Sequence, residues 1–321
     1  WKYIRIKKDD DMDVELRSKV DLLSDNYNDI RKALRWDGNL LNHFEALLYV
    51  RTDKEFSLEK IKEVRKYLDS RKLPYPFKGV FNKICSIMLD DRDDYVQVFN
   101  NTLYVYERLI QNGFKGNEKA AFASLMLAKR FFGKELDNRI NRIIDINSSL
   151  KDNDYISYAN LSCTNRSVDR IRKELTEIEN ILKVTGRESS VDIKSFSTLL
   201  MIDEDNVETK VEKALNIMCN IKSELFEIPD KAYPLLGLAT MLVEDPESFC
   251  VELKDIYNSL KNTKKYRYFM NRDLRIMISL GLLLNKYVEE LKADLIDINV
   301  SDEINVFLAL EECTVFSLSV I

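Results

Sequence analysis

The sequence is poor in the two residues that most often build loops. Glycine and proline together account for 13 of the 321 residues, about 4%, whereas average proteins contain about 12%. Glycine-rich phosphate-binding loops and β architectures with many turns therefore have little material here. Histidine is rarer still. His43 is the only one, which excludes a histidine-rich metal site and makes any Ser/His/Asp or Cys/His centre depend on that residue.

Cysteine offers neither a covalent framework nor a zinc site. The five cysteines lie tens of residues apart, are odd in number and form no Cys-x-x-Cys pair. We interpret them as reduced, small core residues. No other pattern typical of catalysis occurs, so we predict no catalytic residue, no bound metal and no cofactor. Enzymatic activity stays open as the less favoured class.

Long hydrophobic runs are missing as well. Among the long apolar stretches without a charge, Ile276 to Asn285 is about half of the ~20 residues that cross a bilayer. We therefore predict no membrane-spanning helix. Residues 1–8 lack the apolar core of a signal peptide, which favours a cytoplasmic location. Because Met12 opens the first helical pattern, we expect residues 1–11 to be an extension or tag remnant.

What the chain does contain is enough to build a core. Hydrophobic residues make up 45% and charged residues 32%, and the net charge of −5 corresponds to a pI near 5.3. This composition indicates a folded chain. It offers no global attraction to nucleic acid or anionic lipid, so any such binding must be local.

Helical periodicity is strong and recurs along the chain. The apolar residues of 168–182 are spaced 3, 4, 3 and 4 residues apart, which places them on one stripe of a helix. Residues 58–68, 136–150 and 207–225 show the same amphipathic pattern. At Asp245-Pro246 a carboxylate precedes a proline that suits the first helical position.

Between these amphipathic helices we predict shorter helices that are apolar nearly all round, and such helices are typical of an interior position. They cover residues 42–50, 80–89, 120–128, 196–202, 232–242 and 274–284. One apolar residue can be taken as an anchor in each of seven successive units, at intervals of 36 to 42 residues. The anchors are Leu47, Ile87, Leu125, Leu161, Leu199, Met241 and Leu282.

A helix pair of about 40 residues cannot bury its apolar face alone, so consecutive pairs should stack. We predict an all-α fold: a right-handed, α-solenoid-like array of antiparallel helix pairs with about seven units. Residues 12–321 should form a single helical-repeat domain. The unit around residues 155–163 is short and rich in Ser and Asn, so we place a hinge, if the array has one, at 147–165.

Several packing and turn motifs along the first half of the chain form a recognisable set. They are Trp36-Asp37, His43 to Tyr49, Pro76 to Gly79, Tyr106 to Leu109, Asn112 to Phe114 and Ala120 to Ala123. With these motifs the chain resembles, over most of residues 12–290, an uncharacterised bacterial family known as domain of unknown function 4003. That resemblance implies an intracellular, all-helical bacterial protein and carries over no catalytic residue.

The most suggestive binding segment is 261–275, where cations alternate with aromatic residues against a single acid. Such a segment can contact phosphates and stack bases, and it would serve an acidic protein partner equally well. An inter-helix loop with docked aromatics and solvated cations is the alternative interpretation. The candidate binding residues are Lys264, Lys265, Tyr266, Arg267, Tyr268, Arg272 and Arg275.

Two further features have plainer interpretations. His43 could shuttle protons near neutral pH, but it lies among Leu41, Phe44 and Leu47, so a core histidine is the favoured interpretation. Acidic turns at 90–94 and 203–205 could attract a divalent cation. They lack the spacing of a calcium-binding loop, and carboxylates at helix starts are favoured by the helix dipole.

The function we predict is a non-enzymatic scaffold that binds a protein or peptide along its concave inner-helix face. Binding of nucleic acid or a phosphate ligand through 261–275 is the alternative, although the pI argues against a dedicated nucleic-acid binder. An enzyme of unrecognised type around His43 is a second alternative. The apolar segment 304–321 suggests a homodimer contact. We expect no association with membranes.

Overall fold

The computed structural model describes residues 12–51, 56–90, 92–184, 191–202, 205–263, 268 and 270–290. Within these ranges there are fourteen α-helices, one short 3-10 helix at Asp230–Ala232, and no β-strand. The predicted all-α class is therefore confirmed. No helix among these residues is both long enough and apolar enough to cross a bilayer.

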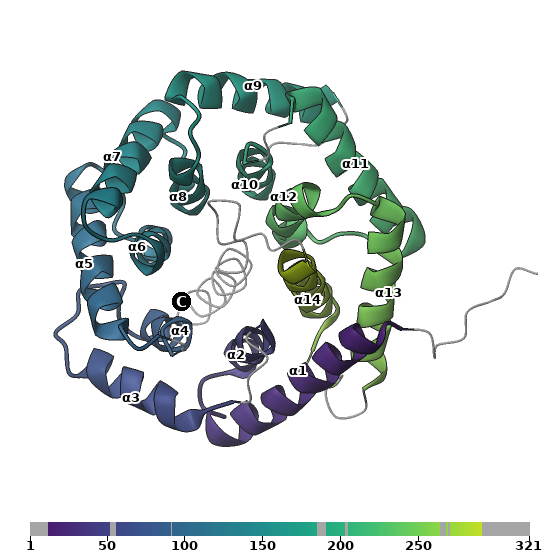
Figure 1. The fold of residues 1–321 in the computed structure, drawn as a ribbon, viewed down its shortest axis with the longest axis horizontal. Coiled ribbons are helices and arrows are strands. Elements are labelled where there is room, and N and C mark those ends of the chain that lie inside the picture. The colour runs from purple at the N-terminus through teal and green to yellow at the C-terminus, as the bar shows by residue number, and fades with distance from the viewer. Residues whose placement is uncertain are drawn as a thin grey trace, which may run out of the picture.

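The helices form two concentric rings that alternate along the chain (Figure 1). The outer ring consists of α1 (Val14–Ala33), α3 (Leu58–Asp69), α5 (Tyr95–Gln111), α7 (Gly133–Leu150), α9 (Val168–Val184), α11 (Val207–Glu224) and α13 (Pro246–Asn262). The inner ring consists of α2 (Asn39–Arg51), α4 (Val80–Met88), α6 (Glu118–Arg130), α8 (Tyr155–Cys163), α10 (Val191–Leu200), α12 (Tyr233–Leu242) and α14 (Arg272–Glu290). Every outer helix packs against the inner helix that follows it.

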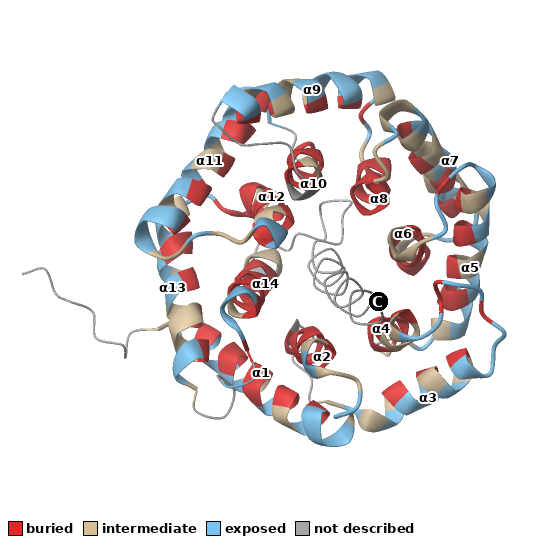
Figure 2. Ribbon diagram, turned by 180° about the vertical axis from the view of Figure 1, so that it is seen from behind, coloured by how far each residue is buried: buried red, intermediate tan, exposed pale blue. Residues whose placement is uncertain are grey.

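The outer helices are amphipathic, as their periodicity predicts. In α9 the stripe residues Ile171, Leu175, Ile178 and Leu182 are buried, whereas Arg172 on the other side is exposed. Figure 2 shows the same division around the ring: buried residues of the outer helices face inward and exposed residues face the solvent. Burial of one stripe is what holds such a helix on the ring.

The inner helices are buried on nearly every side (Figure 2). All nine residues of α8 are buried, including the Ser and Asn residues. Six of the seven sequence anchors are at most 1% exposed, and Met241 is partly buried. The all-round apolar character of these segments therefore reflects contact with the outer helix and with the inner helices on either side.

Two features differ from the expected array. The ring is closed, since α1 packs against α13 and α14 packs against α2, so the chain has no free first or last unit among these helices. The inner helices are seen end-on in Figure 1, whereas the outer helices lie along the circumference, so paired helices cross steeply. The outer ring has a longer circumference than the inner ring. A helix that lies along the circumference covers more of it than a helix parallel to the ring axis would.

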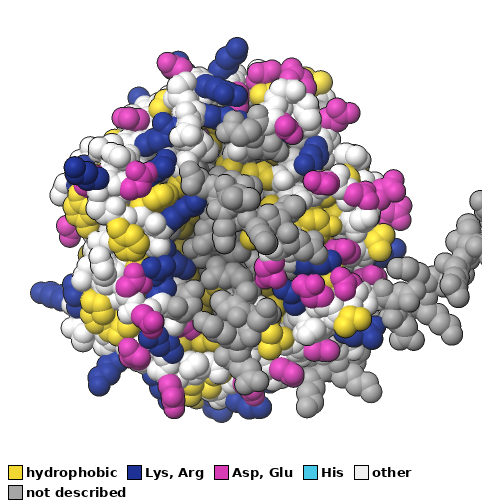
Figure 3. Space-filling model, in the orientation of Figure 1, with side chains coloured by type: hydrophobic (Ala, Val, Ile, Leu, Met, Phe, Trp, Pro, Cys, Tyr) yellow, Lys and Arg dark blue, Asp and Glu magenta, His cyan; other side chains and the backbone are white. Residues whose placement is uncertain are grey.

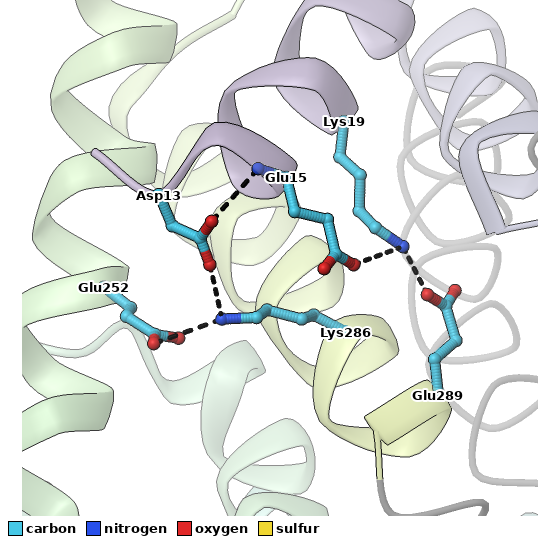
Figure 4. Close-up of polar contacts among 6 residues, drawn as sticks. All are labelled: Asp13, Glu15, Lys19, Glu252, Lys286 and Glu289. Carbon is cyan, nitrogen blue, oxygen red and sulfur yellow. Dashed lines mark hydrogen bonds and ion pairs between the residues drawn. The ribbon is translucent and has the colours of Figure 1, made fainter. Parts of the chain in front are cut away.

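Ion pairs of two buried lysines join α1 to α13 and α14, where the ring closes (Figure 4). Lys286 of α14, whose side chain is only 6% exposed, lies 3.2 Å from Asp13 at the start of α1 and 3.2 Å from Glu252 of α13. Asp13 also accepts a hydrogen bond from the Glu15 N–H and caps α1. These contacts lower the pKa of Asp13, first through the hydrogen bond from Glu15 and then through Lys286.

A second buried lysine, on α1, pairs with α14 where the ring closes; we call this contact of α1 with α13 and α14 the seam. Lys19 of α1 is buried and forms an ion pair with Glu289 of α14 and another, at 3.8 Å, with Glu15 of its own helix. Helices α1 and α14 thus each contribute a buried lysine: Lys19 of α1 pairs with Glu289 of α14, and Lys286 of α14 pairs with Asp13 at the start of α1 (Figure 4). Closure depends on paired charges as well as on apolar packing.

Neighbouring inner helices approach each other closely at one glycine. A Cβ atom added to Gly237 of α12 would lie 3.0 Å from the Leu199 Cβ and 3.2 Å from the Phe196 carbonyl oxygen, both of α10. Only glycine leaves the two backbones this near to each other. The short contact sets the spacing of α10 and α12.

Some sequence predictions concern residues outside the described ranges. They are the extension at 1–11, the dimer segment at 304–321, and Asp91, Asp203 and Glu204 of the acidic turns. The hinge at 147–165 lies inside them. There, α7 ends at Leu150, the next residue Lys151 is in the left-handed conformation, and α8 begins at Tyr155. The hinge stays a prediction.

Candidate functional site

The C-terminal ends of inner helices α6 and α8 lie side by side at one face of the ring. Helix α6 ends at Arg130 because Phe131 adopts an extended conformation, with φ −118° and ψ 148°. Helix α8 ends in the same way at Cys163, because Thr164 is extended. The last carbonyl groups of a helix lack partners within the helix and carry partial negative charge.

Arginine side chains from the turn before α5 and from α7 each satisfy one of these carbonyl groups. Arg92 donates a hydrogen bond to the Lys129 carbonyl oxygen of α6 at 3.3 Å, and Arg139 of α7 donates one to the Ser162 carbonyl oxygen of α8 at 2.8 Å. Arg92 also pairs with Asp94 at 2.7 Å. This part of the ring is therefore rich in guanidinium groups that hold helix ends.

Between the two helix ends lies a pocket of about 280 Å³, including the solvent at its mouth, which we call the α6–α8 pocket. It is lined by Met126, Leu127, Arg130, Phe131, Ala159, Asn160 and Cys163. Asn160 is only 3% exposed, and its Nδ2 atom has no hydrogen-bond partner. An unsatisfied buried donor costs about 1–3 kcal/mol, so this atom would gain from an acceptor placed in the pocket.

The aromatic wall of the pocket carries positive charge. The guanidinium carbon of Arg130 lies 5.3 Å from the centre of the Phe131 ring, and that of Arg139 lies 5.0 Å from it. Glu135 neutralises part of the Arg139 charge through an ion pair at 2.7 Å. The pocket therefore combines apolar walls, the Asn160 amide and a nearby cation, and it has room for about one water molecule.

A second polar cluster lies where α2, α3 and α4 meet, and it contains a buried acid. Glu45 of α2 is 0% exposed, and neither of its carboxylate oxygens has a hydrogen-bond partner. Burial raises the pKa of Glu45 to about 8, against a smaller opposing effect of Arg65. The carboxyl group is therefore protonated at neutral pH.

Most charges around Glu45 are already paired. Asp37 is held between Arg65 of α3, at 2.6 Å, and Lys83 of α4, at 3.0 Å. Tyr49 donates a short hydrogen bond to Asp90, and burial raises the pKa of that tyrosine. With its neighbours engaged in ion pairs and hydrogen bonds, the cluster ties three helices together.

His43 occupies a packing position. Its Nδ1–H donates to the Asn39 carbonyl oxygen at 2.7 Å, and its ring lies 4.2 Å from the ring of Tyr27 of α1. Burial lowers the pKa of His43 to about 4, so the imidazole is neutral near pH 7. A histidine with this pKa is poorly suited to shuttle protons at neutral pH.

The basic and aromatic segment is only partly described. Lys264, Lys265, Tyr266 and Arg267 lie outside the described residues. Tyr268 is 72% exposed.

The two arginines of that segment that are described contact their own chain. Arg272 donates to the Glu227 carbonyl oxygen at 3.2 Å, and Arg275 donates to the Met270 carbonyl oxygen at 3.0 Å. Arg275 also lies over the ring of Tyr257. These contacts fasten the start of α14 to its surroundings. On the face that Figure 3 shows, Lys and Arg side chains are mixed with Asp and Glu around the ring.

The sequence analysis missed two sets of residues. It did not find the α6–α8 pocket, because no motif marks Asn160. It also missed Lys210 of α11, which is fully buried and lies 3.4 Å from Glu174 of α9. Lys210 directly precedes Val211 of the apolar stripe, and a lysine on the buried side of a stripe was the available signal. Among the described residues there is no group of three or more His, Cys, Asp or Glu side chains that could hold a metal ion.

The fold defines an all-helical protein whose inner and outer helices form a closed ring. A family model described as "Protein of unknown function (DUF4003)" matches residues 26–313. Because this match covers most of the chain, the protein belongs to that family. No curated protein and no solved structure is significantly similar to it. Its function is therefore inferred from the arrangement of its own residues.

Proposed function

We propose that this protein is a non-enzymatic scaffold that binds a protein or peptide at the face of its helical ring. The observation that carries the proposal is the α6–α8 pocket, where packed helix ends leave the buried Asn160 Nδ2 atom without a hydrogen-bond partner. The enclosed part of the pocket has room for about one water molecule, so it would take a single polar group of a partner, and the rest of a peptide would lie across the ring face.

The proposal includes a repeated architecture. The inner helices begin at residues 39, 80, 118, 155, 191, 233 and 272, at intervals of 36 to 42 residues. We interpret this spacing as seven units of one outer and one inner helix, arranged as a right-handed array. Because the array closes, its concave side is the inside of the ring, and a partner would approach at the ring faces, where inner helices end.

The contacts described above support this function more than its alternatives. Arg272 and Arg275 contact main-chain groups of their own chain, which leaves them less suited to phosphates. The low pKa and packing of His43 weigh against an enzyme built around it. Binding of an oligonucleotide that weakens steeply with salt would favour the nucleic-acid alternative. A bacterial, cytoplasmic setting and a homodimer contact through 304–321 remain part of the proposal.

A peptide library tests the proposed function directly. Random peptides with free carboxyl termini are immobilised through their amino ends and screened with the full chain. We expect a related set of peptides to be selected and to bind in solution with micromolar Kd, measured by fluorescence anisotropy. If no selected peptide binds the full chain more tightly than a scrambled one, the proposed function is wrong.

A further inference from the structure

We infer that the chain has a second binding surface, on the face of the ring opposite the α6–α8 pocket, and that this surface binds an acidic segment of a partner protein with apolar side chains among its carboxylates. We call it the Trp36 surface. It does not involve the pocket, so it goes beyond the proposed function and is tested separately. Its residues are Arg35 and Trp36 of the loop before α2, and Lys72, Tyr75 and Lys78 of the loop before α4.

The two loops lie side by side because α2 and α4 are neighbours in the inner ring and run in the same direction (Figure 1). Asp37, next to Trp36, lies 3.0 Å from Lys83 in the first turn of α4. At the other end of the same two helices, Tyr49 of α2 donates a hydrogen bond to Asp90, two residues beyond α4. The starts of α2 and α4 therefore share one face of the ring.

The α6–α8 pocket lies on the other face. Arg92, four residues beyond the end of α4, donates a hydrogen bond to the carbonyl oxygen of Lys129 at the end of α6. The ends of α4, α6 and α8 are thus together at the pocket, whereas the Trp36 surface is at the face where inner helices begin.

Two large aromatic side chains of the surface are exposed to solvent. Trp36 is 82% exposed and Tyr75 is 65% exposed. Tryptophan is highly buried on average in folded proteins, so an exposed one is informative. Trp, Tyr and Arg are enriched at protein–protein interfaces and supply much of the binding energy there. Two such rings on neighbouring loops indicate a surface that is covered by a partner.

Both loops are held in place by contacts beneath them. Asp37 lies 2.6 Å from Arg65 of α3, in addition to its ion pair with Lys83. In the loop before α4, Phe77 is only 1% exposed, and its ring contacts the rings of Phe99 and Tyr106 edge-on. The Tyr75 hydroxyl donates a hydrogen bond to Glu118 at 2.6 Å. Loops that are anchored in this way lose little conformational entropy when a partner binds.

The charge around the rings identifies the partner as acidic. Residues 34–38 and 70–79 contain four Lys or Arg and a single acid, Asp37, which is already paired with two cations. Arg35, Lys72 and Lys78 are exposed, and none of them forms an ion pair with an acid in the described part of the chain.

Arg35 also supports the larger ring. Its guanidinium carbon lies 4.4 Å from the centre of the Trp36 ring, and a stacked guanidinium still presents N–H donors that suit a carboxylate. Exposed cations around aromatic rings complement a segment in which carboxylates and apolar side chains alternate. A protein partner is favoured over a nucleic acid because the net charge of the chain is −5, which repels a densely charged phosphate backbone.

The first experiment compares two pools of fluorescein-labelled peptides. In one pool Glu and Asp alternate with randomised apolar residues, and in the other Gln and Asn replace the acids. We expect the acidic pool to bind the full chain with micromolar Kd in fluorescence anisotropy, about 10-fold more tightly than the neutral pool, and to bind more weakly as salt is added. Equal binding of the two pools, or binding of neither, would overturn the inference. So would tighter binding of a single-stranded oligothymidylate of the same length.

Tryptophan fluorescence locates the bound peptide. Trp1 and Trp36 are the only tryptophans in the chain, so Trp1→Phe leaves Trp36 as the sole emitter. The emission of an exposed tryptophan lies at longer wavelength than that of a covered one. Saturation with the acidic pool should therefore shift the Trp36 emission to shorter wavelength. An unchanged spectrum would place the peptide elsewhere and contradict the proposed surface.

Variants separate the contributions of the rings and of the cations. Trp36→Ala, and the double variant Lys72→Gln/Lys78→Gln, should each raise the Kd for the acidic pool about 10-fold, whereas Trp36→Phe should retain most of the binding. The matched control is Lys173→Gln/Lys183→Gln, at two exposed lysines of α9, which should bind like the unchanged chain. Circular dichroism verifies that each variant is folded. If the α9 control weakens binding as much as the loop variant does, the attraction is not localised and the inference is wrong, while the library test of the proposed function is unaffected.

Discussion

Substituting Glu45 with Gln tests the central electrostatic argument about this fold. The Glu45 carboxyl is fully buried in α2, and neither oxygen has a hydrogen-bond partner. Gln has nearly the same shape and stays neutral at every pH. Glu45→Gln therefore removes the cost of keeping an ionisable group in an apolar place, and it leaves the packing almost unchanged.

The magnitude follows from the pKa of Glu45, which burial raises from 4.5 to about 8. Between these values the folded protein holds a proton on Glu45 that the unfolded chain releases. Folding then takes up a proton, so stability is fully present below pH 4.5 and falls as the pH rises towards 8. At about 1.36 kcal/mol per pKa unit, the loss between pH 5 and pH 8 is about 3–4 kcal/mol.

Urea unfolding followed by circular dichroism measures this effect. We expect Glu45→Gln to match the unchanged protein within about 1 kcal/mol at pH 5 and to be about 3 kcal/mol more stable at pH 7. Glu59→Gln, at an exposed glutamate of α3, serves as the control and should show no such change with pH. If the difference between Glu45→Gln and the unchanged protein is independent of pH, the carboxyl is solvated or paired and our reasoning fails.

Three further predictions address closure, packing and the lone histidine. Lys286→Met removes the buried cation between Asp13 and Glu252 and should lower the free energy of unfolding by about 1–2 kcal/mol, because the two carboxylates left behind still reach solvent, whereas Lys32→Met, at an exposed pair, should change it by less than about 0.5 kcal/mol. If the two variants lose the same free energy of unfolding in urea, the Lys286 ion pairs do not stabilise the seam. Gly237→Ala should cost about 1–3 kcal/mol because its Cβ would press on the Phe196 backbone, and an unchanged Tm would contradict that close approach. The single imidazole signal in NMR should titrate near pH 4 in the folded protein and near ~6.5 in urea, so the stability due to neutral His43 is lost as the pH falls from about 6.5 to 4; a folded-state midpoint near 6.5 would refute its burial.

Much of the helical layout was predictable from local patterns. The stripe at 168–182 became the buried side of α9, and the segment around Leu125 became an inner helix that is buried nearly all round. Asp245 caps α13 ahead of Pro246, as the dipeptide predicts. These features depend on residues within a few turns of one another, and a sequence displays such neighbours directly.

The capping interpretation was less accurate for Asp94. Its side chain makes no capping hydrogen bond to α5 but pairs with Arg92, and that hydrogen bond is the largest cause of its lowered pKa. An acidic residue before a helix thus has two competing partners, the helix N-terminus and a nearby cation. The local pattern does not say which contact is shorter.

The candidate site could not be predicted from the sequence. The α6–α8 pocket combines Met126 and Leu127 with Asn160, more than thirty residues away in the chain, and Asn160 has no motif around it. Its missing partner is visible only when the neighbouring helix is in place. Glu45 is similar: a lone acid in an apolar helix was visible in the sequence, but its lack of any hydrogen-bond partner was not.

The sequence by itself determined the all-helical class and the alternation of amphipathic and apolar helices. Helical periodicity and a low content of glycine and proline are properties of short segments, so they favour helices without any long-range contact. The tertiary structure decided that the ring closes, that its paired helices cross steeply, and which polar groups remain unsatisfied. Those outcomes depend on contacts between distant segments, such as Lys286 with Asp13, and on the small geometric differences that separate an open array from a closed one.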